Sequence, residues 1–169
     1  YAGSMLQLKF GLSGVFGTQL LLLGVPLFIV LYTKRDIRST YCLKKTRVSN
    51  FLAGVLIITG AFAINIVIST GLASLFPDSA KNVTTVFDEM MSGNIAGILF
   101  VIAFAPAVCE ELLFRGIILQ SMRARYRITA AIGITAALFG IYHMSLVKLI
   151  PTGFLGLVLC YAAYKADSI

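Results

Sequence analysis

The sequence predicts an all-α fold, a polytopic membrane helix bundle with about five transmembrane helices in this chain. Hydrophobic residues make up 59% of its 169 residues, against roughly 45–50% in ordinary soluble domains. Charged residues make up only 12%, about half of the usual ~25%. The apolar residues form long runs and most charges fall between these runs, so we expect the runs to cross a lipid bilayer.

Five apolar runs are judged against the ~20 residues that a helix needs to cross a bilayer. They cover residues 10–32, 51–76, 94–121, 128–149 and 151–164. The first run lacks a cleavage-site signature, so we interpret it as a membrane span and not as a signal peptide. Because the chain begins with Tyr1 and stops at Ile169, shortly after an apolar run, we interpret it as a fragment of a longer protein.

The charges between the runs predict one alternating orientation. The second loop carries Asp78, Lys81, Asp88 and Glu89 and should face outside, together with the Tyr1 end. The first and third loops are strongly basic and should face the cytoplasm, with Lys34, Arg35, Arg38, Lys44, Lys45 and Arg47 in the first loop and Arg123, Arg125 and Arg127 in the third. The net charge of +7 therefore indicates contact with a lipid bilayer, and without a basic stripe of interleaved aromatics it does not indicate nucleic acid.

Four ionisable residues depart from this pattern because they lie inside predicted spans. Glu110, Glu111 and Arg115 lie on the third run, and His143, the single histidine of the chain, lies on the fourth. A charged side chain in the hydrocarbon layer costs roughly 2.5–3.5 kcal/mol on insertion scales. A functional site is therefore the first hypothesis for these residues.

Helix geometry separates the two glutamates. Glu111 and Arg115 are four residues apart and share a face, whereas Glu110 points about 100° away from Glu111. We therefore expect a structural ion pair and one free carboxylate that is suited to general-base chemistry. Pro106 should kink the helix one turn earlier and open it to water. From the predicted span centres, Glu110 and His143 differ by roughly 9 Å in depth, which helix tilt could absorb.

Simpler interpretations stay open for the same residues. The acid pair and arginine could clamp two helices together or form a transporter coupling site, since ion-pair networks also perturb buried charges. A lone membrane histidine is more often an interhelical hydrogen-bonding residue than a catalyst. Phe139 is most simply a packing residue, and Gly153 and Gly156 are most simply points of close helix packing.

Two motifs resemble those of a known family. Glu110-Glu111-Leu-Leu-Phe-Arg115 resembles the E-E-x-x-x-R motif of the CPBP intramembrane proteases, and Phe139-Gly-Ile-Tyr-His143 resembles their F-x-x-x-H motif. This family includes the CAAX prenyl endopeptidases and Abi-like bacterial proteins linked to bacteriocin processing and self-immunity. The resemblance covers roughly residues 97–165. It divides the chain into N-terminal transmembrane helices and loops, 1–90, and a protease core, 91–169, that is truncated at its C-terminus.

The resemblance implies part of an eight-helix-like α-helical membrane fold in a bacterial plasma membrane. It implies hydrolysis of peptide bonds in membrane-associated protein or peptide substrates, including prenylated CAAX-type ones. Glu110 would activate water with His143 as its partner, while Glu111, Arg115 and Phe139 would support the site. Both a metalloendopeptidase, with zinc on Glu110 and His143, and a metal-independent glutamate mechanism have been argued for the family. One histidine and two glutamates supply a zinc site only with an open or unseen ligand.

The sequence departs from the family in one motif. The family has a third motif, a histidine followed four residues later by Asn, Asp or a similar residue, and the sequence has no second histidine. We attribute this absence to truncation and expect the fragment by itself to be inactive, because oxyanion-type stabilisation is worth ~10²–10³ in rate. The alternative is a non-proteolytic membrane protein, such as a bacteriocin self-immunity factor or part of a permease fusion.

Overall fold

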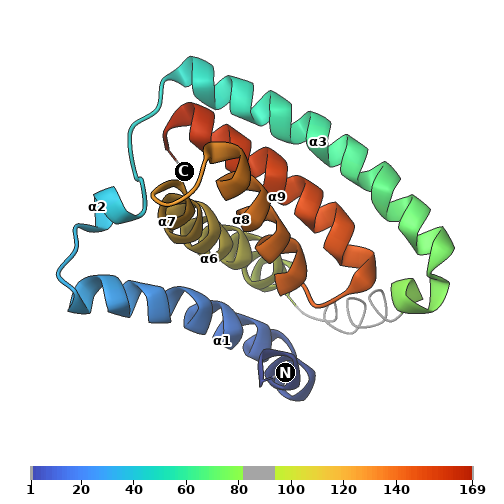
Figure 1. Ribbon diagram of the computed structural model, residues 1–169. Helices are drawn as coiled ribbons and strands as arrows, with labels where there is room; N and C mark the ends of the chain where they lie inside the picture. Colours follow the sequence, from blue (N-terminus) through green and yellow to red (C-terminus); the bar gives the residue numbers. More distant parts are fainter. Residues whose placement is uncertain (1, 82–93, 169) are drawn as a thin grey trace.

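The computed structural model describes residues 2–81 and 94–168, which form helices and no strand (Figure 1). This confirms the predicted all-α fold class. The elements in chain order are α1 (Ala2–Tyr32), α2 (Ile37–Thr40), α3 (Val48–Leu75), α5 (Ile95–Leu99), the π-helix η1 (Phe100–Phe104), α6 (Ala105–Glu111), the π-helix η2 (Leu112–Ile118), α7 (Leu119–Arg123), α8 (Ile128–Tyr142) and α9 (Leu146–Ala166).

Four stretches of the described residues are long and apolar enough to cross a membrane, namely 13–32, 48–75, 95–123 and 147–166. The helix α8 is apolar but has only 15 residues. Large apolar side chains cover the outside of the bundle: on α3, Leu56 is 73% exposed and Val67 is 72% exposed. So much exposed apolar surface marks contact with a membrane. The chain is therefore a multi-pass membrane protein.

The predicted boundary between the last two runs is wrong. The sequence places it between Leu149 and Pro151, whereas α8 ends at Tyr142 and α9 begins at Leu146. Met144 has a left-handed φ of 50° and Ser145 has an extended backbone, so the chain turns between the two helices. Hydropathy does not detect this turn, because neither residue is a glycine or proline and apolar residues continue on both sides.

The helices α8 and α9 form an antiparallel hairpin in the middle of the bundle. The helix α3 runs along α9 on one side, and α1 packs on the opposite side against α6 and the two π-helices (Figure 1). Glycines allow the hairpin to close. A Cβ atom on Gly140 would lie 2.7 Å from the Leu149 carbonyl oxygen, and one on Gly156 would lie 3.1 Å from the Ala136 Cα atom. The predicted close packing at Gly153 and Gly156 is thus confirmed, since Gly153 also lies against Gly140.

Contacts between distant segments gather at one end of the bundle. Asp167, which follows α9, forms an ion pair with Lys44 of the first loop and lies 3.9 Å from the Arg123 guanidinium. The Cys42 thiol donates to the Asp167 carbonyl oxygen at 3.5 Å, and the Ser168 hydroxyl donates to the Lys44 carbonyl oxygen at 2.6 Å.

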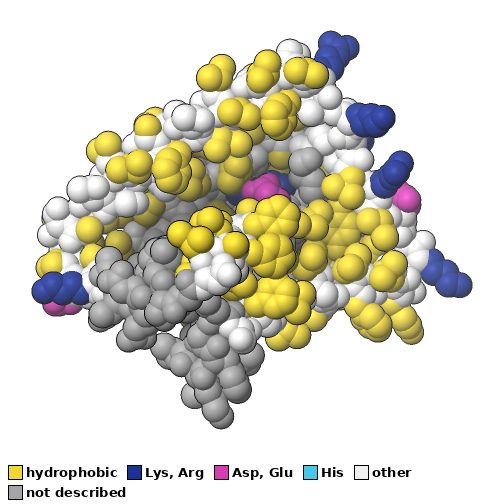
Figure 2. Space-filling model, turned by 180° about the vertical axis from the view of Figure 1, so that it is seen from behind, with side chains coloured by type: hydrophobic (Ala, Val, Ile, Leu, Met, Phe, Trp, Pro, Cys, Tyr) yellow, Lys and Arg dark blue, Asp and Glu magenta, His cyan; other side chains and the backbone are white. Residues whose placement is uncertain are grey.

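The first and third loops therefore share this end, as their charges predict, and Figure 2 shows basic side chains along one edge of the molecule. We call the end of the bundle that carries Lys44, Arg123 and Asp167 the basic end. Which side of the membrane it faces stays a prediction. Of the acidic residues expected in the second loop, Asp88 and Glu89 lie outside the described residues.

Candidate active site

The span that carries both glutamates, 95–123, alternates between α- and π-helix. The helix α6 ends with Glu110 and Glu111 and lies between η1 and η2. Pro106 has no backbone N–H to donate to the Ile102 carbonyl. Just before Pro106 the backbone hydrogen bonds span five residues instead of four, as in the bond from the Ala105 N–H to the Phe100 carbonyl oxygen. A π-helix therefore lies directly before Pro106, and such segments are frequent at functional sites, whereas the kink that opens the helix to water stays a prediction.

Glu111 and Arg115 form the ion pair that their spacing predicts. The Glu111 Oε1 atom lies 3.1 Å from the Arg115 Nη1 atom, and the arginine side chain has no exposed surface. The guanidinium carbon lies 4.5 Å from the centre of the Phe139 ring, which provides a cation–π contact. No nitrogen of this guanidinium has a well-directed hydrogen bond to a described residue. Charge and ring contacts therefore hold Arg115 inside the bundle.

Glu110 is half-buried, and no described residue forms a hydrogen bond or an ion pair with its carboxylate. Arg115, Glu111 and Tyr142 are close enough to affect it electrostatically. In Figure 2, acidic atoms are visible at the bottom of a hollow surrounded by hydrophobic side chains. Glu110 and Glu111 are the acidic residues of the described candidate spans. The carboxylate that is predicted to be free is therefore unpaired within the described structure.

Aromatic rings join the two motif-bearing helices. The Phe114 ring meets the Phe139 ring edge to face, with centroids 4.9 Å apart, and lies 5.7 Å from the Tyr142 ring. The Phe139 ring in turn lies 5.0 Å from the His143 ring. Such pairs contribute about 0.5–1.5 kcal/mol beyond burial of their area. Phe139 thus connects Arg115 of the first motif with His143 of the second.

His143 caps the C-terminus of α8. Its Nδ1 atom lies 2.9 Å from the Phe139 carbonyl oxygen. Because a carbonyl oxygen only accepts, Nδ1 carries the hydrogen of this bond, and Nε2 of the neutral ring is left to accept a proton.

The position of the turn after α8 changes the expected depth of His143. Glu110 lies thirteen residues before Arg123 and His143 lies fifteen residues after Ile128, so both are a similar number of residues from the basic end. The helix boundary behind the expected offset of roughly 9 Å is therefore wrong, because α8 ends seven residues earlier than predicted. No described hydrogen bond or ion pair joins Glu110 and His143, so their partnership stays a prediction.

The metal-ligating potential of the described residues is limited. No group of three or more His, Cys, Asp or Glu side chains within them lies close enough together to hold a metal ion. Catalytic zinc usually takes three protein ligands. The described residues therefore do not form such a site, and zinc bound by Glu110 and His143 stays a prediction.

Two buried or half-buried polar residues, one on α8 and one on α1, were not predicted from the sequence. Tyr142 lies within electrostatic range of Glu110 and packs on Phe114, although one tyrosine in an apolar run carries no signal of its own. Gln19 is buried on α1, which packs against α6, and its Oε1 atom has no hydrogen-bond partner among the described residues. An amide inside an apolar run is the signal that could have identified Gln19.

The comparison with known protein families gives one match. A family model described as type II CAAX prenyl endopeptidase Rce1-like matches residues 92–169, which include both motifs, α8 and α9. This segment, 78 of the 169 residues of the chain, resembles the Rce1-like family. Rce1-like proteins are CPBP-type intramembrane proteases, so the resemblance inferred from the two motifs is confirmed. The match supports an intramembrane endopeptidase of the CAAX type in general. No curated protein and no solved structure gives a significant match.

Proposed function

We propose that this protein hydrolyses peptide bonds of membrane-associated substrates, and that Glu110 activates the attacking water. The observation that carries this proposal is the unequal pairing of the two adjacent glutamates. Glu111 lies 3.1 Å from the buried Arg115, whereas Glu110 has no ion-pair partner among the described residues. A carboxylate that is already paired is a weaker base than a free one. Glu110 is therefore the better general base.

In the proposed reaction, Glu110 removes a proton from a water molecule whose oxygen attacks the carbonyl carbon of the scissile peptide. A new C–O bond forms, and the C–N bond breaks when the leaving nitrogen receives a proton. The protonated Glu110 supplies that proton, and the substrate leaves as a carboxylic acid and an amine. General acid–base catalysis of this kind contributes typically 10²–10⁴-fold in rate.

His143 is the proposed partner of Glu110. Its Nδ1–H bond to the Phe139 carbonyl fixes the ring and leaves Nε2 available toward the substrate. The Phe139 ring contacts both His143 and Arg115, so Arg115 and Glu111 act as positioning residues through it. No step is assigned to a metal ion, because the described residues do not supply three ligands.

Cleavage by the complete gene product, reconstituted in lipid vesicles, tests this proposal. The reporter is a fluorogenic CAAX-type peptide with a prenyl group, compared with the same peptide without it. Glu110→Gln should lower kcat by about 10²–10⁴ at unchanged protein level. Asp78→Asn removes a carboxylate from an exposed position outside the candidate spans and should leave kcat unchanged. Cleavage at the normal rate by Glu110→Gln would exclude Glu110 as the base.

The two peptides address the substrate class. The family description names CAAX prenyl endopeptidases, and the hollow around the acidic atoms is lined by hydrophobic side chains. We therefore expect the prenylated peptide to be cleaved with the higher kcat/KM. Equal kcat/KM for both peptides would contradict the CAAX assignment while leaving the role of Glu110 intact.

A further inference from the structure

A cavity of about 890 Å³ lies at the basic end, between the end of α1, the short helix α2 and the segment from η2 to α7. Its volume falls within the ~300–1,000 Å³ of small-molecule sites. The cavity does not include Glu110 or His143. Ile117, its lining residue on η2, lies seven residues beyond Glu110, which is about 10 Å along the helix. The cavity is therefore separate from the candidate active site.

The lining changes from apolar to cationic along the cavity. Ile29 and Val30 belong to the first candidate span, and Ile117 belongs to the third, so this part of the wall lies at membrane depth. Arg35 and Arg125 lie just beyond the ends of those two spans. A ligand that fits this lining carries an apolar tail and a negatively charged head.

The hydrogen bonds within the lining show which groups are free to bind. Thr33 donates to the Ile29 carbonyl oxygen at 2.7 Å, and Thr40 donates to the Asp36 carbonyl oxygen at 2.7 Å. The guanidinium groups of Arg35 and Arg125 form no ion pair or hydrogen bond with the described residues. These two groups are therefore the free cationic donors of the cavity.

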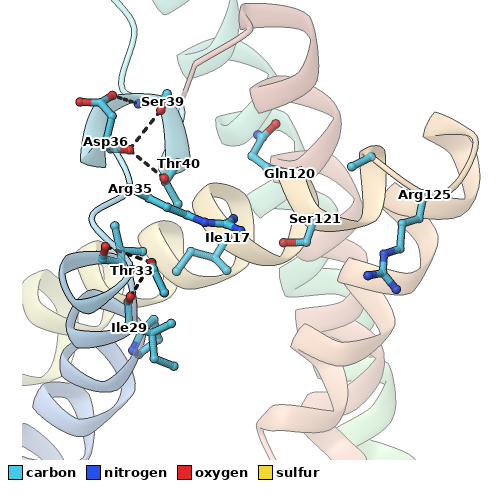
Figure 3. A pocket seen from close by; sticks show the side chains of 13 residues that line it. Ile29, Thr33, Arg35, Asp36, Ser39, Thr40, Ile117, Gln120, Ser121 and Arg125 are labelled. Atoms are coloured by element: carbon cyan, nitrogen blue, oxygen red, sulfur yellow. Dashed lines mark hydrogen bonds between the residues drawn. The ribbon is translucent and has the colours of Figure 1, made fainter.

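The remaining charge of the lining is already engaged. The Asp36 carboxylate accepts the Ser39 N–H at 2.7 Å and points away from the side that Arg35 faces (Figure 3). Figure 3 shows Arg35 reaching from its loop toward Ile117, while Arg125 lies farther along, beyond Ser121. The three charged groups sum to one net positive charge. This charge matches the single negative charge of a phosphodiester.

We propose that this cavity binds an anionic phospholipid from the leaflet at the basic end. Its phosphodiester contacts Arg35, with Arg125 adding attraction from the other side, and one acyl chain lies against Ile29, Val30 and Ile117. The guanidinium group suits this role because its planar set of donors matches phosphate oxygens. The bound lipid would contact both α1 and the segment from η2 to α7. Lipid binding should therefore also stabilise the packing of these two parts of the bundle.

Native mass spectrometry and thermal unfolding of the detergent-solubilised protein test this site. Phosphatidylglycerol should bind and raise the melting temperature more than phosphatidylcholine does, at 0.15 M salt, where the screening length is about 8 Å. The variant Arg35→Gln/Arg125→Gln should bind phosphatidylglycerol at least about 10-fold more weakly, which corresponds to about 1.4 kcal/mol for the charged hydrogen bond to phosphate that Arg35 would lose. Arg35→Lys/Arg125→Lys keeps the charge and should lose much less affinity.

The matched control is Arg47→Gln/Arg127→Gln, which removes the same charge from two exposed residues outside the cavity lining. The control variant should bind phosphatidylglycerol like the unchanged protein. If it lost as much affinity as Arg35→Gln/Arg125→Gln does, the effect would be general surface attraction and the proposal would be overturned. Equal binding of the two lipids would also overturn it. Inorganic phosphate at millimolar concentration should not raise the melting temperature, and a full effect would make this a free-anion site. A higher KM for the CAAX-type peptide with unchanged lipid binding would assign the cavity to substrate.

Discussion

Replacing Gly140 with alanine should weaken the pairing of α8 with α9. The new Cβ atom would lie 2.7 Å from the Leu149 carbonyl oxygen and 3.3 Å from the Gly153 Cα atom. An ordinary contact begins near 3.4 Å, so the helices must move apart by about 0.7 Å. Both obstacles are backbone atoms, which cannot rotate away as a flexible side chain can.

The magnitude follows from comparison with Gly133, which lies on the same helix and has nothing within 4 Å of the position that a Cβ atom would take. Alanine at either position gains about 0.8–1.0 kcal/mol of helix propensity. Overpacking costs about 1–3 kcal/mol and arises only at Gly140. Because the propensity gain cancels, Gly140→Ala should have a free energy of unfolding about 1–3 kcal/mol below that of Gly133→Ala.

The assay is titration of the detergent-solubilised protein with sodium dodecyl sulfate, followed by helical circular dichroism because the chain has no tryptophan. Gly140 lies between Phe139 and His143, so Gly140→Ala should also lower cleavage more than Gly133→Ala does. Identical unfolding midpoints for the two variants would refute the close helix approach at Gly140.

Two further predictions concern the ion pairs. Arg115→Met should lower the free energy of unfolding by about 3 kcal/mol. This is near the lower bound for breaking a buried ion pair, because the Glu111 side chain keeps 36% exposure. Arg115→Met/Glu111→Gln should recover part of that loss in the same unfolding assay, and no recovery would contradict the pairing. The hydrogen bond and charge of Lys44 hold the pKa of Asp167 below its ordinary value. The stability that this bridge contributes is therefore fully present above about pH 4, the ordinary pKa of Asp. It is lost as the pH falls through the lowered pKa. The melting temperature of the unchanged protein minus that of Asp167→Asn should therefore shrink between pH 5 and pH 2, as followed by thermal unfolding, and a constant difference would exclude the bridge.

Much of the fold follows from the sequence because membrane helices bury their backbone hydrogen bonds within themselves. Long apolar runs are then sufficient to locate the helices, and the loop charges correctly bring the first and third loops to one end. The same local rule predicts the pairing of Glu111 with Arg115, since a spacing of four residues places both on one helix face. The two motifs were sufficient to indicate the resemblance to the intramembrane proteases that the match over residues 92–169 supports.

Tertiary structure decided the features that depend on contacts between helices. The end of α8 at Tyr142, which places His143 at the C-terminus of that helix, depends on a turn through Met144 that no glycine or proline marks. The contact of Tyr142 with Phe114 and the cavity beside Arg35 join residues that are distant in the chain. Hydropathy and helix periodicity report only on neighbours within one helix. The packing between helices, which determines where these side chains meet, is set by steric fit along their whole length.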